Sequence, residues 1–190
     1  QSEKVWCASS THETEEILCA KVHKELKKKY SNLLTIIIPR HVERANSIIE
    51  SLKEFNLKIH THKPKKNINR NTEIYIVNSY GETKSFYMSC KNIFLGGSLI
   101  VHGGQNPLEP ARHGCNILYG PYVNNFKKIY DYLDKIQVSK KIRGDKSLFK
   151  NIELLISNKS KGRSVIRRVS NLGDRISKFV IKEIESSLTK

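Results

Sequence analysis

The sequence predicts an α/β fold in which a parallel sheet carries helices on both faces. Short apolar runs typical of buried strands alternate with segments in which apolar residues recur every three or four positions. The strongest run, residues 33–38 (LLTIII), is rich in β-branched residues and is followed by Pro39. Glycine-rich and polar segments come directly after several of these runs. In parallel sheets ligands bind at the carboxyl ends of the strands, so we expect the functional residues in those segments.

The first half of the chain predicts three strands and two helices. They cover, in order, a strand at 5–8, a helix at 13–30, a strand at 33–38, a helix at 42–55 and a weaker strand at 58–61. In the first helix Leu18, Val22, Leu26 and Tyr30 recur every four residues. Residues 62–72 are basic and lack periodicity, which predicts an exposed loop.

The second half continues the alternation and ends in helices. The predicted elements are a strand at 74–77, a helix at 83–90, a strand at 92–95, a helix from Pro107, a strand at 116–119, a helix at 126–136, and tail helices at 147–157 and 163–188. We therefore expect a sheet domain over residues 1–145. Residues 146–190 form a helical tail that packs on this domain or on a neighbouring one.

Composition and charge limit the possible partners. The 190 residues suffice for one compact domain, and 38% hydrophobic and 27% charged residues fit a folded protein. The net charge of +16 favours nucleic acid, an acidic membrane surface or a phosphorylated substrate, unless it reflects only a lysine-rich surface. Basic residues interleaved with aromatic ones, as nucleic-acid binding requires, do not appear. The four cysteines form no C-x-x-C pair and are expected to be free thiols, and we find no signal peptide.

Two candidate sites follow the first two long strands. Ser10 and Thr11 follow the first strand, where they would either cap the next helix or line a substrate site. Arg40 follows the strongest strand, where a guanidinium can give a phosphate two hydrogen bonds. The alternative for Arg40 is a surface ion pair with Glu43.

Two further candidates contain glycines. Gly81-Glu82 follows the strand at 74–77 and is a weak signal alone. The segment 96–110 (GGSLIVHGGQNPLEP) has two Gly-Gly pairs, and Asn106 and Glu109 stand at the N-cap and capping-box positions of the next helix. Exposed backbone N–H groups and a helix N-terminus together predict a cradle for an anion. The pattern is neither a Walker A nor a G-x-G-x-x-G motif.

These segments together resemble the Kdo transferase family, whose members transfer 3-deoxy-D-manno-octulosonic acid (Kdo). The matching segments are VWCASSTHETEE (5–16), LLTIIIPRHVER (33–44), Gly81-Glu82 and GGSLIVHGGQNPLEPA (96–111), and the resemblance covers roughly residues 3–140. Thr14 and Asn78 depart from the pattern, since a glycine and an acidic residue are expected there. The resemblance implies one half of a GT-B fold: a Rossmann-like CMP-sugar-binding domain over residues 1–145, with tail helices that pack on it or cross back to an amino-terminal domain.

The resemblance also implies roles for the candidate residues. Arg40 would meet the CMP phosphate and stabilise it as the leaving group, while Gly81 and Glu82 would line the nucleotide pocket. Asn106 and Glu109 would hold the nucleotide, Glu109 through ribose hydroxyls. The residues that would line the cleft are Ser10, Thr11 and Gly97. The reaction would be an inverting displacement that needs no metal or other cofactor, with the catalytic base in the amino-terminal domain, so we expect this chain to be inactive alone.

The resemblance implies a setting as well. The donor would be CMP-Kdo, and a lipid A precursor would bind through the other domain. The enzyme would work in lipopolysaccharide biosynthesis at the cytoplasmic face of the bacterial inner membrane, against its anionic surface, and not on nucleic acid. The alternatives are another GT-B enzyme that uses a UDP-sugar, or a basic nucleic-acid-binding domain.

Overall fold

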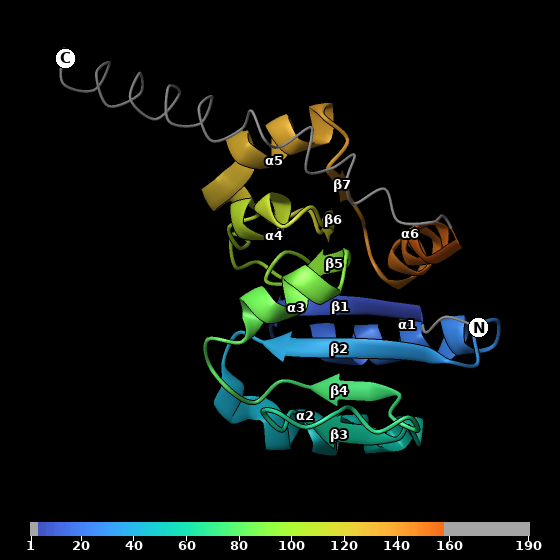
Figure 1. The fold of residues 1–190 in the computed structure, drawn as a ribbon. Coiled ribbons are helices and arrows are strands. Elements are labelled where there is room, and N and C mark those ends of the chain that lie inside the picture. Colours follow the sequence, from blue (N-terminus) through green and yellow to red (C-terminus); the bar gives the residue numbers. More distant parts are fainter. Residues whose placement is uncertain (1–3, 158–190) are drawn as a thin grey trace, which may run out of the picture.

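The structure is a computed structural model that describes residues 4–157, and a seven-stranded parallel sheet forms its centre (Figure 1). The strand order is β3-β4-β2-β1-β5-β6-β7, and each neighbouring pair is parallel. The strands are β1 (Lys4–Thr11), β2 (Leu33–Pro39), β3 (Ile59–Thr61), β4 (Ile74–Ile76), β5 (Asn92–Leu95), β6 (Asn116–Tyr119) and β7 (Ser139–Lys141). The α/β class with a parallel, Rossmann-like sheet is therefore confirmed.

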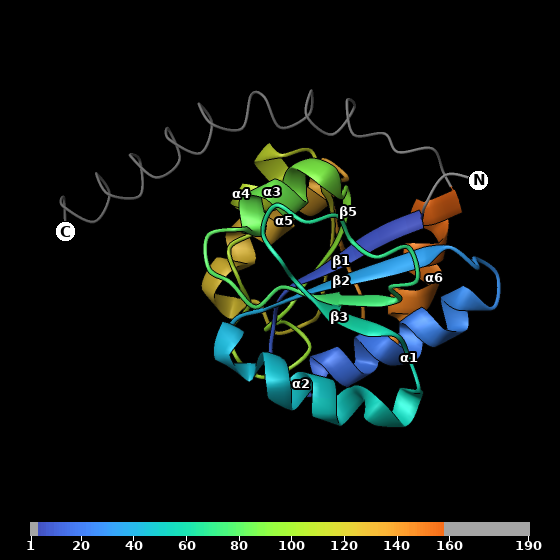
Figure 2. The same cartoon turned by 60° about the horizontal axis from the view of Figure 1, so that its bottom comes forward.

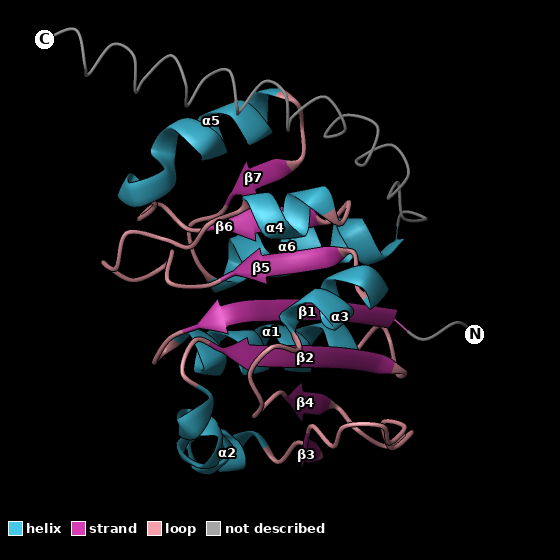
Figure 3. Cartoon of the chain, turned by 60° about the vertical axis from the view of Figure 1, so that its left-hand side comes forward, coloured by secondary structure: helices cyan, strands magenta, loops and turns pink. Residues whose placement is uncertain are grey.

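Helices cover both faces of the sheet (Figures 2 and 3). One face carries α1 (Glu15–Lys27), α2 (Ala45–Leu52) and α6 (Asp145–Ser157). The other carries α3 (Thr83–Ser89), α4 (Leu108–Arg112) and α5 (Lys127–Lys135). In Figure 3 the arrowheads point to one edge of the sheet, where the long connecting loops lie. That carboxyl edge is where the sequence places the candidate residues.

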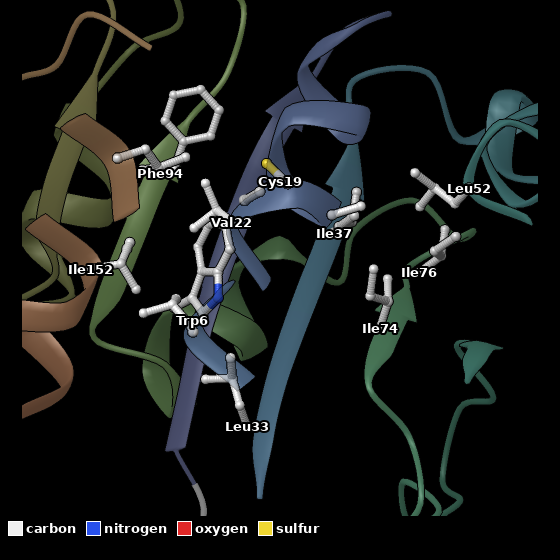
Figure 4. Close-up of a cluster of buried hydrophobic side chains, with 14 of the residues drawn as sticks. Trp6, Cys19, Val22, Leu33, Ile37, Leu52, Ile74, Ile76, Phe94 and Ile152 are labelled. Carbon is white, nitrogen blue, oxygen red and sulfur yellow. The ribbon is translucent and has the colours of Figure 1, made fainter. Parts of the chain in front are cut away.

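The alternation of side chains along each strand divides the core between the two faces. In β1, Trp6 and Ala8 pack with α1, α2 and α6 in the cluster shown in Figure 4. Cys7, between them, packs on the opposite face with Tyr87 and Cys90. Successive side chains of a strand point to opposite faces, so a strand buried on both faces is apolar throughout. This is why the strands were recognisable as short continuous apolar runs.

Most predicted elements are present, with differences at their ends. The strands at 92–95 and 116–119 have the predicted bounds. The predicted helix 42–55 is α2 flanked by two short 3-10 helices, Val42–Arg44 and Lys53–Phe55. Strand β7 was not predicted, because its sequence SKK is polar and its register with β6 defines it.

Helix α6 joins the main core. Its residues Leu148, Ile152 and Ile156 are buried in the cluster that contains α1 and Trp6. The predicted helix 163–188 lies outside the described residues. Within residues 4–157 no helix is long and apolar enough to cross a membrane.

The start of α1 corrects one sequence prediction. Strand β1 runs to Thr11 and the helix begins at Glu15, so neither Ser10 nor Thr11 caps it. The residue before the helix is Thr14, whose φ is +77°. A β-branched residue in this region is strained, which explains why a glycine was expected there.

We predict that Thr14→Gly raises the stability of the chain. Glycine adopts a positive φ without steric cost, so the free energy of unfolding should rise by about 1 kcal/mol, although glycine also gains entropy in the unfolded chain. Thermal denaturation measures the change. Thr14→Ala is the control, since alanine keeps the Cβ that causes the strain. A Thr14→Gly chain that melts below the parent contradicts the prediction.

Candidate functional site

The strand order reverses between β1 and β5, and the loops after these strands meet there. On one side of β1 the sheet continues with β2, β4 and β3, and on the other side with β5, β6 and β7. The backbone N–H of Gly96 donates to Ser9 O at 2.8 Å, and the N–H of Arg40 donates to Thr11 O at 2.9 Å. Such a reversal is where open parallel sheets bind ligands.

Ser10 and Thr11 lie at an irregularity of β1. The register of β1 with β2 passes from Ser9 to Thr11, so Ser10 is an extra residue, and its φ is +55°. A bulge redirects the chain and is often found beside active sites. The Thr11 hydroxyl is buried and has no hydrogen-bond partner in the described part of the chain.

Arg40 is exposed at the carboxyl end of β2, and no ion pair joins it to any residue in 4–157. The alternative pairing with Glu43 is not present. Glu43 instead lies 3.5 Å from His41 Nδ1 and accepts a 3.2 Å hydrogen bond from Tyr80. The neighbouring Arg44 pairs with Glu16 at 2.9 Å.

The predicted anion cradle exists, but the protein's own Glu15 occupies it. The Glu15 carboxylate accepts backbone N–H bonds from Gly97 at 2.8 Å, Ser98 at 3.2 Å and Leu99 at 3.0 Å. A fourth bond comes from His12 N–H at 3.0 Å. The Glu15 side chain is buried, which raises its pKa, and the four N–H groups oppose that rise. The prediction that this backbone binds a ligand anion was wrong for these three N–H groups.

Three kinds of bond hold the glycine-rich loop, residues 96–106: one from the residue after β6, one from α5 and one within the loop itself. Gly120 N–H donates to Ser98 Oγ at 2.8 Å, and Gly104 N–H donates to Gly97 O at 2.9 Å. The Tyr130 hydroxyl donates to Gln105 O at 2.9 Å. The loop is thus fixed at both ends and in the middle before any ligand binds.

Asn106 and Glu109 lie on the exposed side of this loop, at the start of α4. Asn106 Oδ1 accepts the N–H of Leu108 at 3.0 Å, but the N-cap residue of α4 is Pro107, so the prediction of Asn106 as the N-cap was one residue early. The reciprocal capping-box bond to Glu109 is not among the hydrogen bonds of residues 4–157. The Glu109 side chain is exposed and makes no hydrogen bond or ion pair in that part of the chain.

Gly81 and Glu82 lie further from the point of strand reversal, after β4. Gly81 is exposed with a φ of +81°, and Glu82 Oε1 is 3.9 Å from His62 Nε2. No hydrogen bond between described residues joins either of them to the loops after β1 and β5. The structure brings Ser10, Thr11, Arg40 and Gly97 together and leaves this pair at a separate part of the edge.

Sequence reasoning missed several residues of this site. Besides Glu15 they include Gly120, which has no partner nearby in sequence, and His12, which stood inside a recognised segment without a role. The His12 ring lies beside the rings of His102 and His41, with centroids 4.1 and 6.1 Å away. Burial, together with the charges of His102, His41 and the nearby arginines, lowers the pKa of His12 from 6.5 to about 4. No local pattern marks a cluster whose members come from three separate loops.

The sheet, its strand reversal and the basic and glycine-rich loops at one edge define a Rossmann-like ligand-binding domain. The chain is 36% identical over 137 residues to a 3-deoxy-D-manno-octulosonic acid transferase of Haemophilus influenzae, covering 72% of this chain and 32% of that protein. It is 30% identical over 152 residues to the transferase of that name from Aquifex aeolicus, covering 80% and 42%. Over 72–80% of its own length, the chain is therefore similar to part of the 3-deoxy-D-manno-octulosonic acid transferases.

A solved structure supports the fold over nearly the whole chain. The C-terminal CMP-Kdo binding domain of WaaA from Acinetobacter baumannii matches with a TM-score of 0.82 and 24% identity, covering 90% of this chain and 89% of that one. No family model matches the chain. The chain spans about a third to two fifths of the length of the curated relatives named above.

Proposed function

We propose that this chain is the donor-binding part of an inverting glycosyltransferase that moves Kdo from CMP-Kdo to a lipid A precursor. The observation that carries the proposal is the exposed Arg40 guanidinium at the carboxyl end of β2, which pairs with no carboxylate of residues 4–157 and lies beside the fixed loops that follow β1 and β5. A guanidinium binds the oxygens of a phosphate through two parallel hydrogen bonds, as it does those of a carboxylate. The family relationship supports CMP-Kdo as the source of that phosphate.

The proposed roles follow the geometry of the edge. Arg40 binds the phosphate and stabilises the negative charge that grows on it as the bond to the sugar breaks. Ser10, Thr11 and Gly97 line the cleft in which the sugar lies. The exposed Glu109 carboxylate accepts the ribose hydroxyls, and Asn106, Gly81 and Glu82 complete the nucleotide pocket. Since Glu15 already binds the backbone N–H groups of residues 97–99, Arg40 has the larger share in stabilising the leaving phosphate.

The acceptor and the membrane belong to the same proposal. A lipid A precursor binds through a further domain, which also supplies the catalytic base. The net charge of +16 and the exposed basic residues of the loop 62–72 favour the anionic cytoplasmic face of the inner membrane. The exposed basic residues of the loop 62–72 are Lys63, Lys65, Lys66 and Arg70.

Calorimetric titration with CMP, UMP and cytidine tests the nucleotide assignment. We expect CMP to bind about tenfold or more tightly than UMP, since cytosine and uracil exchange a donor and an acceptor that a pocket must match. In Arg40→Ala, CMP should lose about tenfold to a hundredfold in affinity while cytidine binding stays nearly unchanged. Lys84→Ala, which removes an exposed cation of α3, is the control. Equal binding of CMP and UMP favours a UDP-sugar enzyme, and equal losses for CMP and cytidine remove Arg40 from the phosphate site.

A further inference from the structure

Three histidines from three different connections converge at the carboxyl edge of the sheet. His12 follows β1, His41 follows β2 and His102 lies in the glycine-rich loop after β5. The His12 and His102 ring centroids are 4.1 Å apart, and His41 lies edge-on to His12 at 6.1 Å. Gln105 Nε2 is 3.4 Å from His12 Nε2. None of these residues has a role in the proposed reaction so far.

The surroundings of His12 are positive. Arg40 and Arg44 act on His12 together with His41 and His102, and all four lower its pKa. Three carboxylates lie near these basic groups, and each of them contacts another group. Glu16 pairs with Arg44, Glu15 accepts backbone N–H groups including that of His12, and Glu43 lies beside His41. Burial first, and then these basic neighbours, lower the pKa of His12 to about 4, so His12 is uncharged near neutral pH.

The position of the cluster beside Arg40 matches the chemistry of the donor. Kdo is an ulosonic acid, so its anomeric carbon carries a carboxylate as well as the bond to the phosphate. A site for such a donor must bind two anions attached to one carbon. Arg40 binds one of these anions, the phosphate. The histidines are neighbouring polar groups to which the proposed function assigns no role.

We propose that His12 and His102, with the Gln105 amide, form the subsite for the carboxylate on the anomeric carbon of the donor sugar. This inference rests on the proposed function and adds the element that separates an ulosonic acid donor from a neutral sugar donor. A carboxylate placed here relieves the repulsion among the cations and accepts hydrogen bonds from the imidazole and amide groups. The bond from Tyr130 to the Gln105 carbonyl holds the amide-bearing residue in place.

The subsite makes donor binding depend on pH with a definite sign. A bound carboxylate stabilises the charged form of His12, so the pKa of His12 rises from about 4 in the free protein. Between the free and the bound pKa, binding takes up a proton. The affinity gained in this way is present below the bound pKa and is lost as the pH rises through it.

Titration calorimetry of the 190-residue chain with CMP and with freshly prepared CMP-Kdo tests the subsite. Measurements at about pH 6 in buffers of different ionisation enthalpy should show more proton uptake with CMP-Kdo than with CMP. His12→Asn should lose about tenfold in affinity for CMP-Kdo and less than about twofold for CMP. His60→Asn, on the distant strand β3, is the matched control and should bind both ligands as the parent does.

Three results would overturn the inference: equal losses for the two ligands in the variant, equal binding of the two ligands by the parent, or no binding of either. Equal losses for CMP and CMP-Kdo in His12→Asn would mean that the histidine binds the phosphate or shapes the loop. If His12→Asn does not fold, the exposed His102→Asn carries the same comparison. If the parent chain binds CMP and CMP-Kdo with equal affinity and equal proton uptake, the carboxylate subsite is disproved, while the nucleotide assignment stands. If the parent chain binds neither ligand, both the subsite and the nucleotide assignment are disproved.

Discussion

Replacement of Glu15 by alanine is expected to lower the free energy of unfolding by about 3 kcal/mol, and the melting temperature by about 10 °C. The change leaves four backbone N–H groups without their acceptor, at a position where the side chain is 1% exposed. Because the glycine-rich loop loses its support, CMP affinity should fall as well. Thermal and urea denaturation measure the first effect, and calorimetry measures the second.

Glu13→Ala is the matched control for Glu15, since Glu13 is an exposed acid two residues away. Its effect should stay within about 0.5 kcal/mol. The pKa of Glu15 is raised by burial above its usual value of 4.5, so its stabilising contribution is full below that value and declines as the pH rises through the folded-state pKa. The melting difference between parent and Glu15→Ala should therefore be larger at about pH 5 than at about pH 8. A difference that grows with pH contradicts the assigned direction.

Gly120→Ala is expected to be the most damaging single methyl addition in the described part of the chain. A Cβ at Gly120 would lie 2.1 Å from Ser98 O and 2.6 Å from Leu99 N, and both are backbone atoms. Backbone atoms cannot turn away, so the loop must move. We expect a loss of about 3 kcal/mol or more, or failure to obtain soluble protein, together with loss of CMP binding.

Gly81→Ala serves as the comparison for Gly120→Ala. A Cβ at Gly81 meets no atom within 4 Å, and only its positive φ opposes the change. The cost should be about 1 kcal/mol, and the chain should still fold. Parallel measurement of melting temperature and soluble yield for the two variants separates crowding from backbone strain. Equal effects at both positions would contradict the close approach of β6 to the glycine-rich loop.

The elements were readable from the sequence because burial on both faces makes strands such as 33–38 apolar throughout. The strand order was not readable, since no local pattern says that β1 lies between β2 and β5. Strand β7 escaped prediction for a related reason: its residues SKK are placed by pairing with β6 and not by their own hydrophobicity.

The site shows the same division between local and distant causes. Arg40, Ser10 and Thr11 were found because each follows a strand directly, and the structure brings these loops together. The glycine-rich loop was recognised as an anion-binding segment, but its anion was misassigned. Glu15 was interpreted only as an acid suited to a helix start, because its bond to Gly97 joins positions 82 residues apart. The histidine cluster was missed because its members come from three loops.

The position of β1 at the centre of the sheet also has a consequence for the kinetics of folding. The half of the sheet from β1 to β4 forms from neighbouring segments, whereas β5 must return to β1 after a long excursion of the chain. Closing so large a loop costs entropy before any contact compensates for it, which slows folding. Contacts across this seam, including the bond from Gly97 to Glu15, then form late. Interactions absent from the folding transition state govern the rate of unfolding, so the seam sets how long a folded molecule lasts once it has formed.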